Sequence, residues 1–248
     1  MAKQSSLGSA FFAGIYDISG DVGSIGTIET TRAALDVTGI DKSALERITG
    51  RRDGTMSFNA FFNTAAGQEH IALSALLRTD LQASVFIGST VGDAAASVLG
   101  KQLTYSQALG ADGSLVNASS VAGNGNGLGV EWGEMLTTGK QSFATGTVNG
   151  TSIDLGSAST AFGAAAYLHV FTMPSGTATF AVQDSTDNIT FNNVTGMAFT
   201  GATGPTTQRV QGAIGATVLR YVRIQGTGVH GTSLIAVNFV RYTESSAA

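Results

Sequence analysis

The sequence contains no cysteine among its 248 residues. This absence excludes disulfide bonds, thiolate zinc sites and cysteine nucleophiles, so stability must come from packing and assembly. The sequence also lacks the run of about 18 apolar residues that a membrane span requires, and its first residues lack the apolar core of a signal peptide. We therefore expect no membrane insertion, and synthesis and folding in a cytoplasm.

Charge is scarce as well, because only 12% of the residues are Asp, Glu, Lys or Arg. The net charge of −4 and the pI near 5.3 argue against affinity for bulk nucleic acid or anionic membranes, which require a positive field. Much of the charge gathers between Glu29 and Asp53, where five bases lie among five acids. A phosphate-binding surface should be net basic, so this balance argues against a nucleic-acid clamp.

The rest of the composition favours a folded, mainly β protein. Hydrophobic residues make up 43% of the chain, and its 33 glycines show no period, which excludes a disordered or collagen-like chain. A length of 248 residues favours two domains. Charge thins out and short strands begin to recur near residues 150–156, so we expect one domain over residues 1–152 and a second over residues 153–248.

In the first domain, strict alternation of apolar and polar residues predicts a half-buried strand over residues 55–62. The sequence IDKSALERITG before it, at residues 40–50, predicts a short helix. Asp41 can accept a hydrogen bond at the N-terminus of this helix, and Gly50 can adopt the left-handed conformation that ends it. On this interpretation the charged stretch is a long structured loop.

An apolar stripe at helical spacing predicts a second helix over residues 67–79. Apolar runs predict further strands over residues 83–88, 101–109 and 127–136. Residues 111–127 are rich in Asn, Asp and Gly, which favour turns, so we expect a loop at the tip of a hairpin there.

The second domain has short apolar segments separated by turn signals, which is the spacing of a β-sandwich. The predicted strands cover residues 166–173, 177–185, 189–196, 217–226 and 233–242. In the last of them Ile235, Val237 and Phe239 form a core face. Asn238 on the opposite face should meet water or a partner.

The sequence contains no recognisable catalytic or nucleotide-binding motif. The segment GEMLTTGKQ has five residues between its glycines where a phosphate loop has four, and Gln141 stands where that loop needs Ser or Thr. The three histidines, His70, His169 and His230, show no metal-ligand pairing. We therefore expect no enzyme activity, no metal and no cofactor.

Two acidic segments have residue types that also occur in catalytic or metal sites. Glu131 and Glu134 flank Trp132, but positions three apart on a strand point to opposite faces, so these carboxylates cannot share a site. We expect Trp132 to anchor a core or an interface. The acidic segment at residues 184–188 lacks the spacing of a calcium hand and fits a hairpin turn.

Four features occur together in residues 16–62: the segment Asp17-Ile18-Ser19-Gly20, the loop sequence LDVTG, the expected short helix, and Arg52-Asp53-Gly54 leading into an aromatic strand. Together they resemble the N-terminal part of major tail tube proteins of long, non-contractile-tailed bacteriophages, the siphophages. The C-terminal half of the chain is similar to the β-sandwich domains found at the ends of such proteins.

The resemblance implies a mainly β fold, with an N-terminal β-sandwich or barrel domain, one flanking helix and a long loop. It further implies a structural virion protein, six copies of which form a ring whose sheets join around a lumen. The rings stack into the tail tube, through which the phage DNA passes to the host without specific binding. The resemblance places the C-terminal sandwich on the tube exterior and adds the tail tape measure, tail terminator and distal tail proteins as partners.

In that family the long loop reaches the next ring. A balanced charge and several apolar residues suit such a seam, where apolar anchors supply affinity and opposite charges fix the register. We therefore expect the inter-subunit contact to include Arg32, Leu35, Val37, Ile40, Leu45, Arg47, Arg51, Arg52 and Asp53. The alternative is a solvated loop with local ion pairs.

Two functions of other classes stay open. A carbohydrate-binding adhesin or a decoration protein of the virion would use the C-terminal sandwich, with Tyr167, Phe191 or Tyr242 as stacking platforms. A glycan hydrolase would need a carboxylate pair, for which Glu131 and Glu134 are the candidates.

Overall fold

The protein is built from antiparallel strands. The structure, a computed structural model, describes residues 7–123 and 129–243. These residues form two sheets, one of 12 strands and one of 5 strands. Within the described ranges α-helix is limited to α1 (Glu69–Leu73). The expectation of a mainly β protein is confirmed, whereas the expected flanking helix is wrong.

The larger sheet crosses both halves of the chain. Its path contains, in spatial order, β15 (Thr206–Gln211), β12 (Ala164–Thr172), β17 (Ser233–Arg241), β8 (Val130–Met135), β6 (Ala94–Leu109), β5 (Leu81–Phe86), β1 (Ala10–Ala13) and β2 (Tyr16–Asp17). A branch leads from β6 through β7 (Leu115–Gly123) and β4 (Arg47–Phe61) to β3 (Val22–Asp36). The short strand β9 (Gln141–Phe143) pairs with β17.

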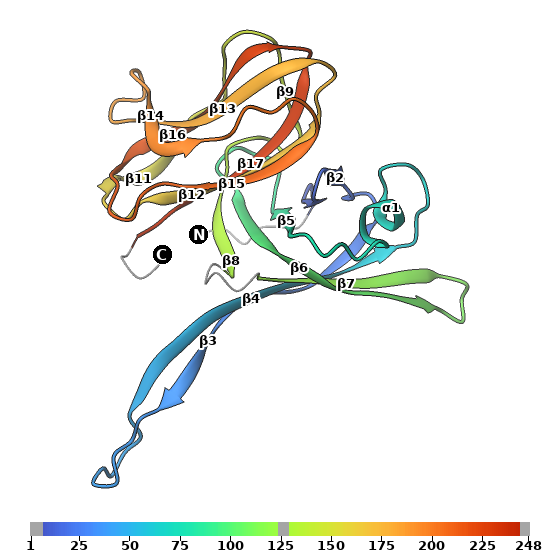
Figure 1. Cartoon of the computed structure of the whole chain (residues 1–248), viewed down its shortest axis with the longest axis vertical. Coiled ribbons are helices and arrows are strands. Elements are labelled where there is room, and N and C mark those ends of the chain that lie inside the picture. Colours follow the sequence, from blue (N-terminus) through green and yellow to red (C-terminus); the bar gives the residue numbers. More distant parts are fainter. Residues whose placement is uncertain (1–6, 124–128, 244–248) are drawn as a thin grey trace.

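The smaller sheet belongs to the C-terminal part of the chain. Its strands are β10 (Val148–Asn149), β11 (Ile153–Thr160), β13 (Gly176–Ser185), β14 (Asn192–Ala198) and β16 (Val218–His230). Figure 1 shows this sheet stacked on β12, β15 and β17 as the second of two layers. Side chains from both layers, among them Leu168, Phe180, Ile224 and Val237, form one hydrophobic core.

The alternation that predicts a strand over residues 55–62 is confirmed, since Met56, Phe58 and Ala60 of β4 are buried. The other predicted strands are also present, with their ends displaced by a few residues. Alternation and apolar runs predict most of these strands because one or both of their faces lie on a core, whereas residues 101–109 belong to the part of β6 that has no buried residue.

The helix expected over residues 40–50 is wrong, because β4 begins at Arg47. Residues 37–46 form the turn of a hairpin between β3 and β4, in which Val37 N donates to Glu46 O at 3.0 Å. An isolated short helix is marginally stable, whereas β3 and β4 pair along nearly their whole lengths. The strand ladder therefore decides the local structure.

The helix expected over residues 67–79 is shortened to the five residues of α1. Two side chains of β6 take the place of further helical hydrogen bonds. Gln102 Nε2 donates to the carbonyl oxygen of Leu73 at 2.8 Å, and Lys101 Nζ donates to that of Arg78 at 2.7 Å. Carbonyl groups past the last helical turn need such partners, and here the neighbouring strand supplies them.

The loop expected over residues 111–127 is wrong for its middle part, which forms β7. Asn117, Ser119 and Val121 are the buried residues of this strand. Asn117 Nδ2 donates to Glu69 Oε1 at 2.5 Å, so a polar contact replaces apolar packing at an inward position. Because polar residues stand at inward positions of β7, a hydrophobicity pattern alone does not show the alternation of this strand. Residues 124–127 lie outside the described residues.

Two main cores meet at a seam. One core belongs to the N-terminal half and one to the C-terminal half, and a smaller cluster between them contains Phe12, Phe86, Met135 and Phe171. The expectation that Asn238 faces water or a partner is wrong. It is buried, and its Nδ2 donates to Ser97 Oγ at 2.8 Å, because β17 pairs with β12 and with β8 inside the larger sheet. The division into two domains stays a prediction.

Candidate assembly surface

The hairpin of β3 and β4 continues beyond the body of the protein as a two-stranded ribbon. We call residues 29–53 the arm and residues 36–46 its tip. Figure 1 shows the arm projecting away from the rest of the chain. At the tip, Thr38 donates to Asp36 Oδ1 from both its hydroxyl, at 2.5 Å, and its amide, at 2.9 Å. These hydrogen bonds lower the pKa of Asp36, which therefore stays charged at neutral pH.

The arm carries an unusual number of exposed apolar side chains. Five of them leave roughly half or more of their surface in water: Leu35, Val37, Ile40, Leu45 and Ile48. Two are directly opposite each other across the ladder, since Leu35 pairs with Ile48. Exposed apolar side chains gathered on one element mark an interaction surface, whereas isolated ones need no explanation.

The structure places all nine residues of the predicted inter-subunit contact on the arm. Eight of them are exposed. The exception is Arg52, which is half-buried and donates from a terminal nitrogen to the carbonyl oxygen of Val130 at 3.0 Å. The structure places these residues on a two-stranded ribbon, and their role in a contact between subunits stays a prediction.

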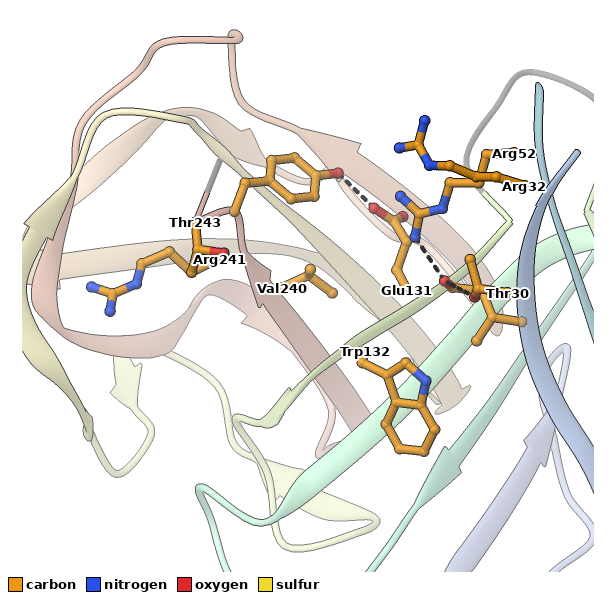
Figure 2. A pocket seen from close by; sticks show the side chains of 10 residues that line it. Thr30, Arg32, Arg52, Glu131, Trp132, Val240, Arg241 and Thr243 are labelled. Atoms are coloured by element: carbon orange, nitrogen blue, oxygen red, sulfur yellow. Dashed lines mark hydrogen bonds between the residues drawn. The ribbon is translucent and has the colours of Figure 1, made fainter. Parts of the chain in front are cut away.

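A cleft of about 480 Å³ lies where the arm joins the body. Figure 2 shows its polar walls, with Arg32 and Arg52 together on the arm side and Arg241 on the opposite side. Trp132 of β8 also lines this cleft, and Trp132 and Arg241 line a second cleft of about 430 Å³. The indole is 48% exposed, so Trp132 is not a core residue. Its role as an interface anchor stays a prediction.

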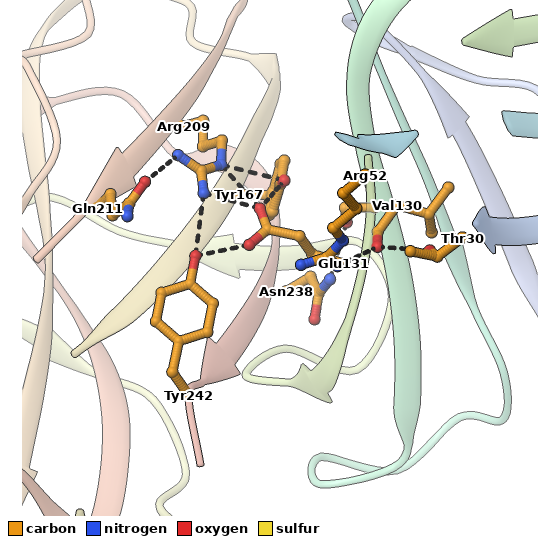
Figure 3. A network of polar contacts seen from close by, with 10 residues as sticks. Thr30, Arg52, Val130, Glu131, Tyr167, Arg209, Gln211, Asn238 and Tyr242 are labelled. Atoms are coloured by element: carbon orange, nitrogen blue, oxygen red, sulfur yellow. Dashed lines mark hydrogen bonds and ion pairs between the residues drawn. The ribbon is translucent and has the colours of Figure 1, made fainter. Parts of the chain in front are cut away.

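The residue before this tryptophan explains its exposure. Glu131 is buried, and neighbouring residues on a strand point to opposite faces. Arg209 of β15 reaches Glu131 Oε2 at 2.7 Å, and Tyr242 donates to Glu131 Oε1 at 2.6 Å. Tyr167 also donates to Glu131 Oε2, as Figure 3 shows. The network joins β8 of the N-terminal half to strands of the C-terminal half.

This network corrects two sequence-based hypotheses. Tyr167 and Tyr242 are buried, so the expectation that they form exposed platforms for a sugar is wrong. Burial, together with the nearby charge of Glu131, raises the pKa of both tyrosines, which keeps their hydroxyl groups protonated as donors. Phe191 is half-buried and lies 4.0 Å below the Arg223 guanidinium. Glu131 and Glu134 are three positions apart on β8 and therefore on different faces, and only Glu131 is buried.

The three histidines stay on separate elements. His70 contacts Tyr105 at 2.6 Å, and His230 contacts the carbonyl oxygen of Gly231 at 2.5 Å. His169 lies 2.8 Å from Ser84, but both are buried, so this serine is closed to a substrate. Across residues 7–123 and 129–243, no three His, Cys, Asp or Glu side chains form a group that could hold a metal ion, and no helix is long and apolar enough to cross a membrane.

Two strand edges complete the surface. The branch of the larger sheet follows the order β6, β7, β4, β3, and all of its pairings are antiparallel. β3 pairs only with β4, and the part of β6 from residue 101 onward pairs only with β7, as far as the described residues go. Each end of this four-stranded branch therefore offers unpaired backbone groups.

No protein-family model and no curated protein matches the sequence. Among solved structures, the chain is similar to one from the tail of an empty GTA particle refined with C6 symmetry, with 15% identity and a TM-score of 0.38 over 50% of this chain and 96% of that one. It is also similar to the SPP1 Dit (gp 19.1) protein, described as a hub adsorption apparatus of phages that infect Gram-positive bacteria. That match has 9% identity, a TM-score of 0.32, and covers 94% of this chain and 99% of the other.

A third similarity is to a chain of the phage p2 baseplate in its activated conformation with Sr. Its identity is 7% and its TM-score is 0.34, over 94% of this chain and 98% of that one. All three structures come from phage or particle tails and baseplates. At these identities and TM-scores the three similarities are resemblances and carry no argument about function.

Proposed function

We propose that the chain is a non-enzymatic structural protein of a phage tail that assembles with copies of itself, and specifically a subunit of the tail tube. The observation that carries this proposal is the arm, with its exposed Leu35, Val37, Ile40, Leu45 and Ile48. Such side chains gain free energy when a neighbour covers them, at about 25 cal/mol per Å² of apolar surface. An arm that stays exposed to water does not gain this free energy.

The open edges of β3 and β6 support the same proposal. Long unpaired edges invite uncontrolled association, and native proteins cover them or close them against a neighbour. Strand directions alternate through β6, β7, β4 and β3, so β3 of one copy beside β6 of the next would continue the antiparallel pattern. A contact between two different edges is head-to-tail, and it produces a ring when the rotation closes.

The proposal extends to the virion. Copies join into six-membered rings, the rings stack into the tube, and the C-terminal layers lie outside it. A net charge of −4 is compatible with a wall that lets DNA pass without binding it. Tape measure, terminator and distal tail proteins are the expected partners at the two ends of such a tube. These statements rest on the sequence resemblance.

The rival functions have less support. A sugar-binding surface loses two of its three proposed platforms, because Tyr167 and Tyr242 are buried. A hydrolase loses its carboxylate pair, because Glu131 is held by Arg209 and two tyrosines on the face opposite Glu134. No observation of the described residues favours either function over assembly.

The proposal is tested by the state of the purified chain in solution. We expect rings or tubes of six-fold symmetry in negative-stain electron micrographs, and sedimentation that shifts to large species as concentration rises. The variant Ile40→Asp with Leu45→Asp should sediment as a monomer with an unchanged circular dichroism spectrum. Ile189→Asp is the matched control, because Ile189 is equally exposed on a turn far along the chain. Discrete wild-type monomers at every concentration would contradict the proposal.

A further inference from the structure

The charges of the arm are distributed unevenly along its length. The tip contains three acids, Asp36, Asp41 and Glu46, and a single base, Lys42. Arg47 lies at the boundary, directly opposite Asp36 in the ladder, and the root beyond it has the opposite sign, with Arg32, Arg51 and Arg52 beside Glu29 and Asp53. An overall balance of charge therefore conceals an acidic end and a basic end.

The basic end faces the cleft that contains Trp132. Arg32 and Arg52 are direct partners in the ladder between β3 and β4, and both line the cleft. Like charges directly opposite each other across a ladder repel and destabilise the pair. Arg241 also lines the cleft, but its guanidinium points away from these two arginines and donates to Leu155 O, Leu219 O and Ser157 Oγ. Glu131 lines the cleft as well, and its carboxylate already bonds Arg209, Tyr167 and Tyr242. The cleft therefore has an excess of positive charge.

The apolar part of the cleft is Trp132. It is the single tryptophan of the chain and is 48% exposed between two clefts. Trp and Arg are the residues most enriched at the energetic centres of protein interfaces, above all where a pocket lets the partner insert. A suitable ligand for this cleft combines carboxylates for the arginines with aliphatic side chains for the indole.

The tip of the arm has that combination. Its acids alternate with exposed Val37, Ile40 and Leu45. It cannot turn back into the cleft of its own chain, because the ladder continues through Ala34↔Thr49 to Asp36↔Arg47 and keeps the two strands extended. At about 3.3 Å per residue, the four residues from Arg32 to Asp36 already separate tip and cleft by roughly 13 Å.

Building on the function proposed above, we infer that the tip of one copy docks in the cleft of Arg32, Arg52 and Trp132 of a second copy. The two surfaces differ, so the contact is head-to-tail: each copy offers one tip and one cleft. Carboxylates of the tip separate the two opposed arginines, and the aliphatic side chains cover the indole. This inference names the binding site that receives the arm, whereas the exposure of the arm indicates only that some partner covers it.

A mixing experiment tests this pairing. The tip variant Ile40→Asp with Asp41→Lys keeps a normal cleft, and the cleft variant Trp132→Ala keeps a normal tip. Each alone should sediment as a monomer, whereas an equimolar mixture should form a one-to-one dimer and grow no further. Trp132→Phe is the matched control and should assemble nearly like the wild type. Normal polymers from both single variants, or a mixture that stays monomeric, would overturn the inference.

A second measurement separates this inference from the proposed function. A cyclised peptide of residues 34–49 is titrated into the full-length chain, and the fluorescence of Trp132 is recorded. We expect a saturable change that is about tenfold weaker for Arg32→Glu, and equally weakened for a peptide with Lys in place of Asp36 and Asp41. If the wild type never polymerises but this binding is seen, the tube proposal fails and the docking site stands. If polymers form but the peptide leaves the fluorescence unchanged at millimolar concentration, the docking site fails alone.

Discussion

At the scale of single residues, His169 is the most constrained titratable group of the seam. Its ring is buried beside Phe12 and Phe171. Nδ1 lies 2.7 Å from the carbonyl oxygen of Gly14 and must carry the proton, since a carbonyl only accepts. Nε2 then accepts from the hydroxyl of Ser84 at 2.8 Å. Burial disfavours the charged imidazolium and lowers the pKa of His169 from 6.5 to about 4.

This shift predicts a loss of stability in mild acid. Between pH 6.5 and about 4 the unfolded chain binds a proton at His169 that the folded chain does not. The free energy of unfolding therefore falls as the pH drops through this window, by about 3 kcal/mol at most, and is fully retained above it. Urea titrations at pH 5 and pH 7 should show a smaller difference for His169→Gln than for the wild type. An equal difference in the two proteins would exclude His169 as the origin.

At the scale of elements, the crossing of β4 and β8 depends on Gly54. Gly54 lies inside β4, well before its end. A Cβ atom at position 54 would overlap the backbone nitrogen of Val130 and the backbone of Gly129. Glycine is needed here because another backbone approaches closely, which is a common reason for glycine within a strand.

Gly54→Ala should therefore destabilise the protein. Forcing extra volume into a packed contact costs about 1 to 3 kcal/mol, and here the obstacle is backbone, which cannot change rotamer. Urea unfolding should show the loss. Gly20→Ala is the matched control, because a Cβ at that position has no atom within 4 Å. Equal stability of the two variants would mean that β8 moves aside without cost.

The elements also show what a single sequence can and cannot predict. The strand over residues 55–62 was predictable because its alternation depends on one core face, and the strand over residues 233–242 was predictable from its apolar run, since β17 is buried on both faces. The arm was expected as an exposed segment, but its helix was wrong, because cross-strand pairing between residues 11 to 15 positions apart outweighs a local helical signal. β7 was missed because Asn117 and Ser119 stand at inward positions. The cleft could not be predicted, since it joins residues of four strands, β3, β4, β8 and β17, that only the fold brings together.

At the scale of the whole molecule, the buried network links the two halves. Removing Arg209 leaves the carboxylate of Glu131 buried without its cation, a change that costs about 3 to 5 kcal/mol in other proteins. Arg209→Met should lower the free energy of unfolding by that order, measured by urea titration. Arg220→Met is the matched control, because its ion pair with Asp154 is exposed and should matter far less.

The same urea titration of the wild type should give one transition by far-UV circular dichroism and by Trp132 fluorescence, because the seam joins both cores.

The hydrophobic clusters of the described residues include no side chain between Ala33 and Arg51. The side chains of the outer arm therefore contribute little to the stability of the folded protein. Its sequence can drift, lengthen or exchange with that of a relative while the cores stay as they are, so new partners can be tried without the destabilisation that limits change elsewhere. Selection on this stretch comes from the neighbour it meets, and specificity can evolve there one residue at a time.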